Sequence, residues 1–211
     1  IGTLTKMFLY SSLISLNIMT SAVRGRVEKE LSPECRKFLY MGTPPTGLAL
    51  DSLRFICQRY HRKPRYVTLY NIVDRIPVYS AYTFKRSDGL KCVDVPWMYE
   101  PQLSTSSATD EMQPFPRGYT PFNSEDNQAV LDDYANAILY ERGTLNPDEH
   151  QNEPDDKAST YTLTNVVPVV PEFNIQLNSA LNSVMSNCII YTVLFLLNMK
   201  TLHEHALMNF W

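Results

Sequence analysis

Two β-rich segments that lie close together in the chain constrain its fold most. Residues 65–70 and 76–84 are rich in valine, isoleucine, threonine and tyrosine, and the five residues between them include Asn71 and Asp74. Such side chains favour strands, and asparagine and aspartate favour turns, so the pattern predicts an antiparallel β-hairpin. Because proline lacks a backbone N–H, we expect Pro77 at an edge strand or at the start of its strand. Alternation places on one face of the second strand Val78, Ser80, Tyr82 and Phe84, and on the other Pro77, Tyr79, Ala81 and Thr83.

The rest of the chain gives weaker signals. Residues 51–60 are interpreted as a short helix, and residues 99–127, with four prolines among serines, threonines and acids, as a long surface loop. The acidic stretch 148–156 predicts a second polar loop. A helix is predicted at about 173–185, and residues 188–197 are apolar enough for a buried strand. The apolar face of that helix carries Leu177, Leu181, Val184 and Met185.

Size and charge bound the kind of protein. With 211 residues, 44% of them hydrophobic and 19% charged, the chain fits one globular domain. Its net charge of -3 argues against holding nucleic acid by bulk electrostatics, since such proteins usually carry a basic excess. Any contact with nucleic acid is therefore expected to be local.

The N-terminal segment has the pattern of a secretory leader. A lysine, an apolar stretch at 8–19 and small residues near Ala22 predict a signal peptide over residues 1–25, with translation starting at Met7. The alternatives are a buried amphipathic helix or a short membrane anchor, but the stretch is shorter than the ~20 apolar residues that a span needs. We therefore expect a secreted or secretory-pathway protein without a stable membrane span.

Four cysteines fit an oxidising compartment. Cys35, Cys57, Cys92 and Cys188 allow three pairings, of which we favour Cys35 with Cys57. The sequence contains no Cys-x-x-Cys spacing, so a structural zinc site is not expected.

Four motifs occur together and in a recognisable order, at residues 42–47, 68–80, 140–143 and 161–165. Across residues 35–185 they resemble the DNA/RNA non-specific endonuclease family. The resemblance implies an α+β fold with an antiparallel sheet and a ββα-metal nuclease core. It predicts a nuclease-like domain over residues 26–188 and a divergent apolar tail over 189–211, so the sheet is expected to be incomplete at the C-terminus, as in a truncated product.

The resemblance also implies catalytic roles. The family places a general base and Mg²⁺ together, because phosphodiester hydrolysis needs an activated water and a cation to neutralise charge on the phosphate. Arg142 matches the family's phosphate-facing arginine. Thr144 matches the position of its general-base histidine, and a threonine hydroxyl cannot accept a proton near neutral pH. Loss of a general base costs about 10²- to 10⁴-fold in rate, so activity is expected to be weak or lost.

Two asparagines follow the family's metal-site pattern, and a third departs from it. Asn165 and Asn174 have the spacing of a structural asparagine and of the asparagine that binds magnesium directly. Asn182 stands where the family often has a glutamate. One amide oxygen makes a weak site, in which the waters kept by magnesium need acceptors in the surrounding shell.

Several residues have two competing interpretations. Arg142 could face a phosphate or pair with Asp132 or Asp133. His150 could be a displaced base, but a solvated histidine in a polar loop is favoured. The basic run at 59–65 could guide a nucleic-acid backbone, but a solvated connection into the first hairpin strand is favoured. The histidines at 203 and 205 lack the spacing of a metal site.

The leading hypothesis is a magnesium-dependent phosphodiesterase domain with a degenerate active site and, through the resemblance, DNA or RNA as its partner. The alternative is a non-catalytic module that binds nucleic acid or an unassigned protein partner on a nuclease scaffold. A third possibility is a truncated product without a function of its own.

Overall fold

The computed structural model describes residues 27–28, 30–48, 50–85, 87, 93–118, 121, 123–135 and 140–170, and the backbone of residues 189–193. Within these residues no helix has the length and apolar character that crossing a membrane requires. The predicted leader at 1–25, the predicted helix at 173–185 and most of the tail at 189–211 lie outside the described residues.

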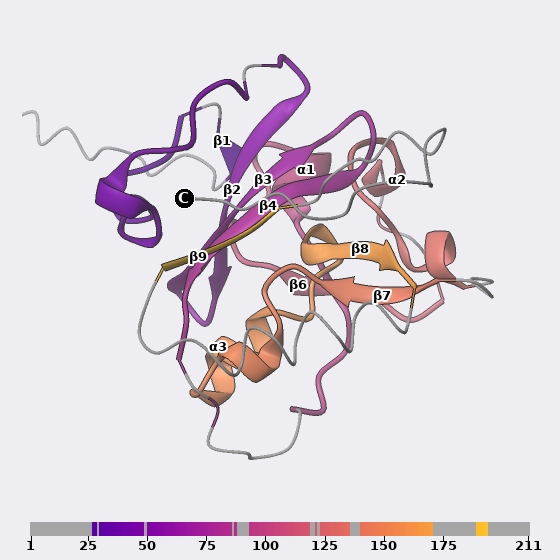
Figure 1. Cartoon of the computed structure of the whole chain (residues 1–211). Helices are drawn as coiled ribbons and strands as arrows, with labels where there is room; N and C mark the ends of the chain where they lie inside the picture. The colour runs from indigo at the N-terminus through magenta and orange to yellow at the C-terminus, as the bar shows by residue number, and fades with distance from the viewer. Residues whose placement is uncertain are drawn as a thin grey trace, which may run out of the picture.

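A five-stranded antiparallel sheet forms the body of the domain (Figure 1). Its order in space is β1-β2-β3-β4-β9, so β9 returns from the far end of the chain to pair with β4. The strand expected within 188–197 is therefore present. The bounds are Val27–Glu28 for β1, Leu53–Tyr60 for β2, Lys63–Asn71 for β3, Ile76–Thr83 for β4 and Ile189–Val193 for β9.

Strands β3 and β4 form the predicted hairpin. The Asn71 side chain organises its turn: Oδ1 accepts hydrogen bonds from the backbone N–H groups of Val73 and Asp74 at 3.0 and 3.3 Å, and the amide donates to the Asp74 carboxylate. Pro77 is the second residue of β4, an interior strand, where the register with β3 shifts. The missing N–H is thus accommodated at an irregularity near the strand start.

The predicted alternation of β4 is confirmed from Tyr79 to Phe84 but is wrong at Val78. Val78 lies at the register shift between β3 and β4 and packs against the cluster of Tyr79 and Ala81, on the face opposite to the predicted one. Tyr79 and Ala81 belong to a core cluster on one face of the sheet, whereas Tyr82 and Phe84 pack with Tyr66 in another cluster. The first face is covered by residues 31–39, which include the 3-10 helix η1 (Arg36–Phe38), and a second 3-10 turn, η2 (Tyr40–Gly42), follows. On the opposite face, β4 contacts β8 and Ser80 bonds Asn165, so this face of the sheet carries the candidate site.

The expectation of a helix at 51–60 is wrong. This segment is β2, which pairs with β3 from Leu53 opposite Asn71 to Tyr60 opposite Lys63, and also pairs with β1. Its neighbours bond it on both sides, and both of its faces contain buried residues. Long-range pairing therefore outweighs a weak local preference for helix.

The long surface loop predicted at 99–127 is also corrected. Glu100, Leu103 and Met112 are buried, and Gln128 holds the backbone of Glu100 by accepting from its N–H at 2.9 Å and donating to its C=O at 2.8 Å. In this segment the helices and strands are short, and a polar side chain forms the hydrogen bonds of backbone groups that regular structure would otherwise provide. The short elements are β5 (Met98–Tyr99), α1 (Pro101–Ser104), β6 (Gln113–Pro114) and α2 (Ser124–Asn127).

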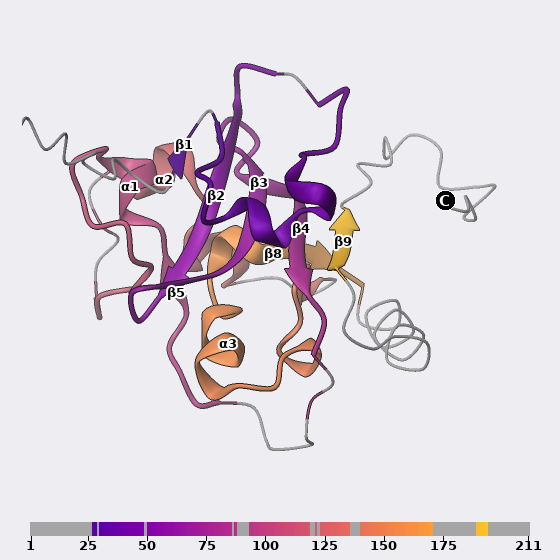
Figure 2. The same cartoon turned by 90° about the vertical axis from the view of Figure 1, so that its left-hand side faces the viewer.

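A second, two-stranded sheet of β7 (Glu141–Thr144) and β8 (Val166–Val169) lies beside the main sheet, and β8 contacts β4 (Figures 1 and 2). The 3-10 turn η3 (Leu131–Tyr134) precedes β7. Between β7 and β8 the chain forms η4 (Asp148–His150), α3 (Pro154–Ser159) and η5 (Leu163–Asn165). The segment at 148–156 is therefore partly helical rather than a free loop. The described architecture is α+β with antiparallel sheets, as predicted.

A disulfide joins Cys35 to Cys57, which confirms the favoured pairing. Both residues are buried, and their Cα atoms are 5.9 Å apart. The bridge ties the segment that covers the sheet to strand β2. Cys92 and Cys188 lie outside the described residues.

We expect the double substitution Cys35→Ala with Cys57→Ala to lower the free energy of unfolding by about 2–4 kcal/mol, because the bridge restricts the unfolded chain. Its partners are separated by 22 positions. Urea unfolding followed by circular dichroism measures the change. A reducing agent should destabilise the native chain and leave the double variant unchanged, and an unaltered unfolding midpoint in the variant would contradict the assigned role.

Candidate active site

Strand β7 presents both motif residues to the same side. Arg142 pairs across the ladder with Pro168, and Thr144 with Val166. Residues two apart in a strand share a face, so the two side chains lie next to each other along β7. Arg142 is exposed and Thr144 is half-buried.

The glycine between them is required by close packing. A Cβ atom at Gly143 would lie 2.6 Å from Cγ2 and 2.9 Å from Cγ1 of Val169 on β8. Cβ atoms do not tolerate such distances, so a larger residue would force the Val169 side chain or the strand itself to move. The motif glycine is therefore required by the packing of β7 against β8, independently of any chemistry at Thr144.

Asn165 locks the segment that directly follows the motif. It is fully buried, and its Oδ1 accepts hydrogen bonds from the Ser80 hydroxyl and the Asn146 N–H, both at 3.0 Å. Its Nδ2 donates to the carbonyl groups of Asn146 and Thr160, also at 3.0 Å. The N–H of Leu145 donates to the Asn165 carbonyl at 2.9 Å. All hydrogen-bonding positions of this amide are in use, so it has none left for a metal ion.

The bonds of Asn165 continue into the main sheet through a buried polar row, formed by Gln58 on β2, Thr68 on β3 and Ser80 on β4. The hydroxyls of Thr68 and Ser80 are 3.1 Å apart, and Gln58 Nε2 donates to Thr68 at 3.3 Å and to Thr164 at 2.8 Å. The polar row therefore connects three strands to the 3-10 turn that holds Asn165.

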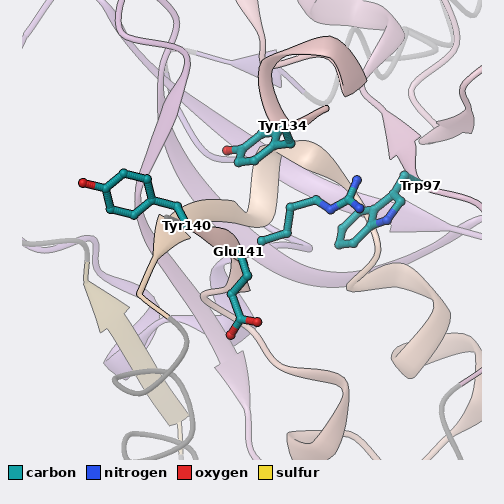
Figure 3. A pocket seen from close by; sticks show the side chains of 5 residues that line it. Trp97, Tyr134, Tyr140 and Glu141 are labelled. Atoms are coloured by element: carbon teal, nitrogen blue, oxygen red, sulfur yellow. The ribbon is translucent and has the colours of Figure 1, made fainter. Parts of the chain in front are cut away.

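A pocket of about 360 Å³ lies beside the exposed face of β7 (Figure 3). Figure 3 shows Tyr140 at one end, Trp97 at the other and Tyr134 between them, with the Glu141 carboxylate directed away from Trp97. The full lining is Trp97, Tyr134, Tyr140, Glu141 and Arg142.

Within this pocket the Arg142 guanidinium stacks over Trp97, with Cζ 5.0 Å from the ring centroid. The alternative interpretation, an ion pair with Asp132 or Asp133, is not found among the described residues. Asp133 instead lies 3.6 Å from Arg75 and accepts a hydrogen bond from the N–H of Val130. Cation–π contact leaves the edge of a guanidinium free to donate hydrogen bonds, so the geometry of Arg142 suits a phosphate that enters the pocket.

Tyr134 shares this environment. Burial, together with the charge of Asp133, raises the pKa of its phenol to about 12, although Arg142 opposes the shift. Tyr134 is therefore a neutral hydroxyl at physiological pH. The pocket thus combines one cation, Arg142, and one acid, Glu141, with three aromatic side chains.

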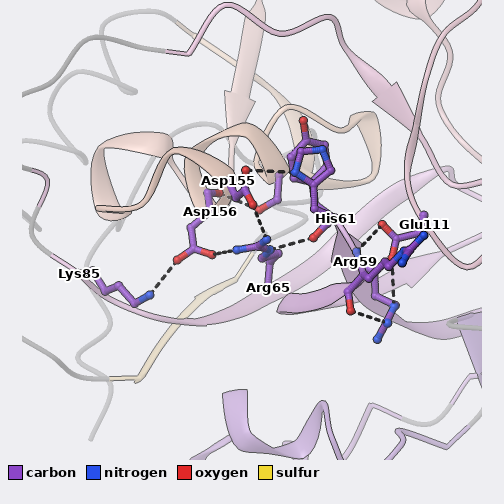
Figure 4. A network of polar contacts seen from close by, with 10 residues as sticks. Arg59, His61, Arg65, Lys85, Glu111, Asp155 and Asp156 are labelled. Atoms are coloured by element: carbon purple, nitrogen blue, oxygen red, sulfur yellow. Dashed lines mark hydrogen bonds and ion pairs between the residues drawn. The ribbon is translucent and has the colours of Figure 1, made fainter.

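The basic run at 59–65 covers the end of β2, the turn at 61–62 and the start of β3, and three of its residues are paired with acids (Figure 4). Arg59 lies 3.4 Å from each of three acids, and Arg65 bonds two carboxylates of α3 at 2.8 Å. His61 and Lys85 bond the same two acids of α3. Burial would raise the pKa of Asp156, but the bonds from Lys85 and Arg65 outweigh it and lower the pKa below its usual value. Arg59 and Arg65 therefore offer little free positive charge to a nucleic acid, and the exposed charge of the run is limited to the turn and the first residue of β3.

His150 is buried, which corrects the expectation of a solvated histidine. Its Nδ1 lies 2.8 Å from the Tyr82 hydroxyl, and its ring meets Phe84 edge-on at 5.0 Å between centroids. Burial lowers its pKa to about 4, although Asp148 opposes the shift. The other described histidine, His61, bonds Asp155 at the β2–β3 turn. Neither histidine is open to the pocket at Arg142 as a replacement base.

The magnesium candidates Asn174 and Asn182 lie outside the described residues. Within the described ranges, no group of three or more His, Cys, Asp or Glu side chains could hold a metal ion.

Three pocket residues were not identified from the sequence. Trp97 is distant from β7 in sequence, whereas Tyr134 ends the 3-10 turn that precedes β7, and no local pattern marks either of them. Tyr140 is the first residue of the motif at 140–143, so its position was the one available signal.

The arrangement agrees with the comparisons to known sequences. The profile of the DNA/RNA non-specific endonuclease family matches residues 50–184. The chain belongs to the DNA/RNA non-specific endonuclease family.

Two curated relatives share this region. The chain is 36% identical over 183 residues to the endonuclease domain-containing 1 protein of Homo sapiens, a match that covers 84% of this chain and 36% of the relative. It is 35% identical over 159 residues to the protein of the same name from Mus musculus, covering 74% and 31%. The chain therefore spans about a third of the length of these relatives.

We expect Asn165→Ala to lower the free energy of unfolding by about 3 kcal/mol or more, because it leaves several buried polar groups without partners. Thermal and urea unfolding measure the loss. Asn152→Ala, at an exposed asparagine, is the matched control and should stay within about 0.5 kcal/mol of the native chain. Equal effects of the two substitutions would contradict the assigned role of Asn165.

The buried His150 also predicts a pH dependence. Its pKa is about 4 in the folded chain and 6.5 in the reference state, so between these values the unfolded chain binds more protons. Stability should therefore fall as pH decreases from about 6.5 towards 4, by about 2 kcal/mol from this group. Urea unfolding between pH 7 and 4.5 should show a shallower decline for His150→Gln than for the native chain. His61→Gln should keep the native slope, and an equally steep decline in His150→Gln would refute the assignment.

Proposed function

We propose that this chain is a nuclease-like domain in which the family's activity, magnesium-dependent phosphodiester hydrolysis, is weak or lost. The observation that supports this most directly is Thr144, which lies beside Arg142 on β7, where the family has its general-base histidine. A hydroxyl of this kind does not take a proton from water near neutral pH. Strands β7 and β8 would supply the two strands of a ββα-metal core, whose expected helix lies outside the described residues.

The other residues of the site are suited to binding the substrate phosphate and not to proton transfer. Arg142 would donate hydrogen bonds to a phosphate oxygen while Trp97 holds its guanidinium plane. Asn165 would keep β7 in place through the segment that follows Thr144. Magnesium, if bound, would neutralise charge on the phosphate, and Asn174 is the residue proposed to ligate it.

Secretion belongs to the same proposal. The buried Cys35–Cys57 disulfide supports an oxidising compartment, as does the leader expected at 1–25.

A second candidate is a non-catalytic module on the same scaffold, which binds nucleic acid or a protein. The retained Arg142 pocket favours it, since binding needs the arginine and not the base. The net charge of -3 and the paired basic run limit nucleic-acid binding to this local contact.

Restoring the base tests the proposal. We expect Thr144→His to raise the rate of cleavage of plasmid DNA or RNA by about 10²- to 10⁴-fold over the native chain in the presence of Mg²⁺. Thr144→Val, which keeps the shape without the hydroxyl, should stay at the native level. In the Thr144→His background, Arg142→Ala should abolish the gain, whereas Lys63→Ala, at an exposed lysine of the β2–β3 turn, should retain it.

Two outcomes would contradict the proposal that this chain is a nuclease-like domain inactivated by the loss of its general base. Robust magnesium-dependent cleavage by the native chain that survives both Arg142→Ala and Asn174→Ala would refute it. A folded Thr144→His chain that does not cut would favour the binding module. A salt titration of binding then tests whether the ligand of that module is nucleic acid, because affinity for nucleic acid must fall as the salt concentration rises.

A further inference from the structure

The walls of the Arg142 pocket are mostly aromatic. Trp97, Tyr134 and Tyr140 come from three separate segments and line one cavity of about 360 Å³ (Figure 3). Trp97 and Tyr134 pack against the buried cluster of Ala129, Leu163 and Val166, so the rings at that end are held by the core. Tyr140 at the other end is 41% exposed. The volume lies at the lower end of the range for small-ligand sites.

Aromatic rings beside an arginine are the usual means of holding a nucleobase outside a helix. Base faces stack on tryptophan and tyrosine, and this stacking is available to every base. Arg142 supplies the matching charge, because its guanidinium lies over Trp97 at 5.0 Å and no described residue forms an ion pair with it. One nucleotide could therefore place its base against the rings and its phosphate against Arg142.

A duplex would fit this surface poorly. Its bases already stack on one another, so presenting one to the rings requires unstacking. Duplex binding also relies on rows of cations along the phosphates. Arg59, Arg65 and Lys85 are paired with acids and do not provide such a row.

We propose that the pocket binds one unpaired nucleobase, so that the strand recognised beside Arg142 is single-stranded DNA or RNA. This inference rests on the proposed function, because the phosphate of the same nucleotide is the group that faces Arg142. Trp97 acts as a positioning residue for Arg142, and Tyr140 is the accessible wall of the base site.

Binding of short fluorescent strands to the full 211-residue chain tests the pocket. The probes are a 12-residue oligothymidylate, an oligouridylate of the same length, an abasic strand with the same phosphates, and a blunt duplex hairpin. Anisotropy is measured at low salt with EDTA, so that no strand is cut. We expect one or both base-bearing single strands to bind about five- to a hundredfold more tightly than the abasic strand and the duplex.

Substitutions of Tyr140 test whether the preference for base-bearing single strands comes from the pocket. Tyr140→Ala should reduce single-strand affinity to the abasic level, and Tyr140→Phe should restore it because the ring is kept. Tyr40→Ala, at a tyrosine 69% exposed and outside the pocket, is the matched control and should bind like the native chain. Thermal melting confirms that each variant is folded.

The outcomes separate this inference from the proposed function. If all probes bind equally, and Arg142→Ala weakens them while Lys63→Ala does not, the phosphate contact stands and the base site is refuted. If no probe binds, the base site and the nucleic-acid function both fail. A single-strand preference that is unchanged in Tyr140→Ala also overturns the assignment.

Discussion

The hydrogen bonds of one buried amide, that of Asn165, position the candidate site on the domain. They join Ser80 of the main sheet, Asn146 after β7 and Thr160 at the end of α3. A buried amide is costly unless its bonds are made, so these three parts of the chain are held in one arrangement. The strand with Arg142 and Thr144 therefore takes its position from the sheet, through contacts that involve neither side chain.

The residues that hold the fold around β7 are different from the residues proposed to take part in catalysis. Gly143 allows β7 and β8 to pack closely, and Asn165 fixes the segment after β7, whereas the Thr144 side chain forms no hydrogen bond with the described residues. The residue at the base position can thus change without disturbing the fold. Arg142 is supported instead by Trp97, whose ring lies under its guanidinium. The proposed binding surface at Arg142 is therefore structurally independent of the residue at the proposed base position.

How much the sequence revealed depended on whether the determining contacts were local. The β3–β4 hairpin was predictable because its alternation and its Asn71 and Asp74 turn lie within twenty residues of one another. Residues 51–60 were misread as helix because pairing with β1 and β3 decides their state. His150 looked solvated because the Tyr82 and Phe84 rings that enclose it lie more than sixty residues away in sequence. The motif identified Arg142, but Trp97, on which its guanidinium stacks, lies 45 positions away in sequence and has no pattern that marks it.

The polar row of Gln58, Thr68 and Ser80 also has a consequence for the order of assembly. Strands β2, β3 and β4 are joined by turns at 61–62 and 72–75, so they meet through short loop closures. Ser80 and Asn165 are 85 positions apart, and Gln58 and Thr164 are 106 apart. Contacts of that separation form late, because the chain entropy of the long loop is lost before they stabilise anything. We therefore expect the β7–β8 pair to dock after β2, β3 and β4 have paired, and the pocket beside Arg142 to be incomplete until it does.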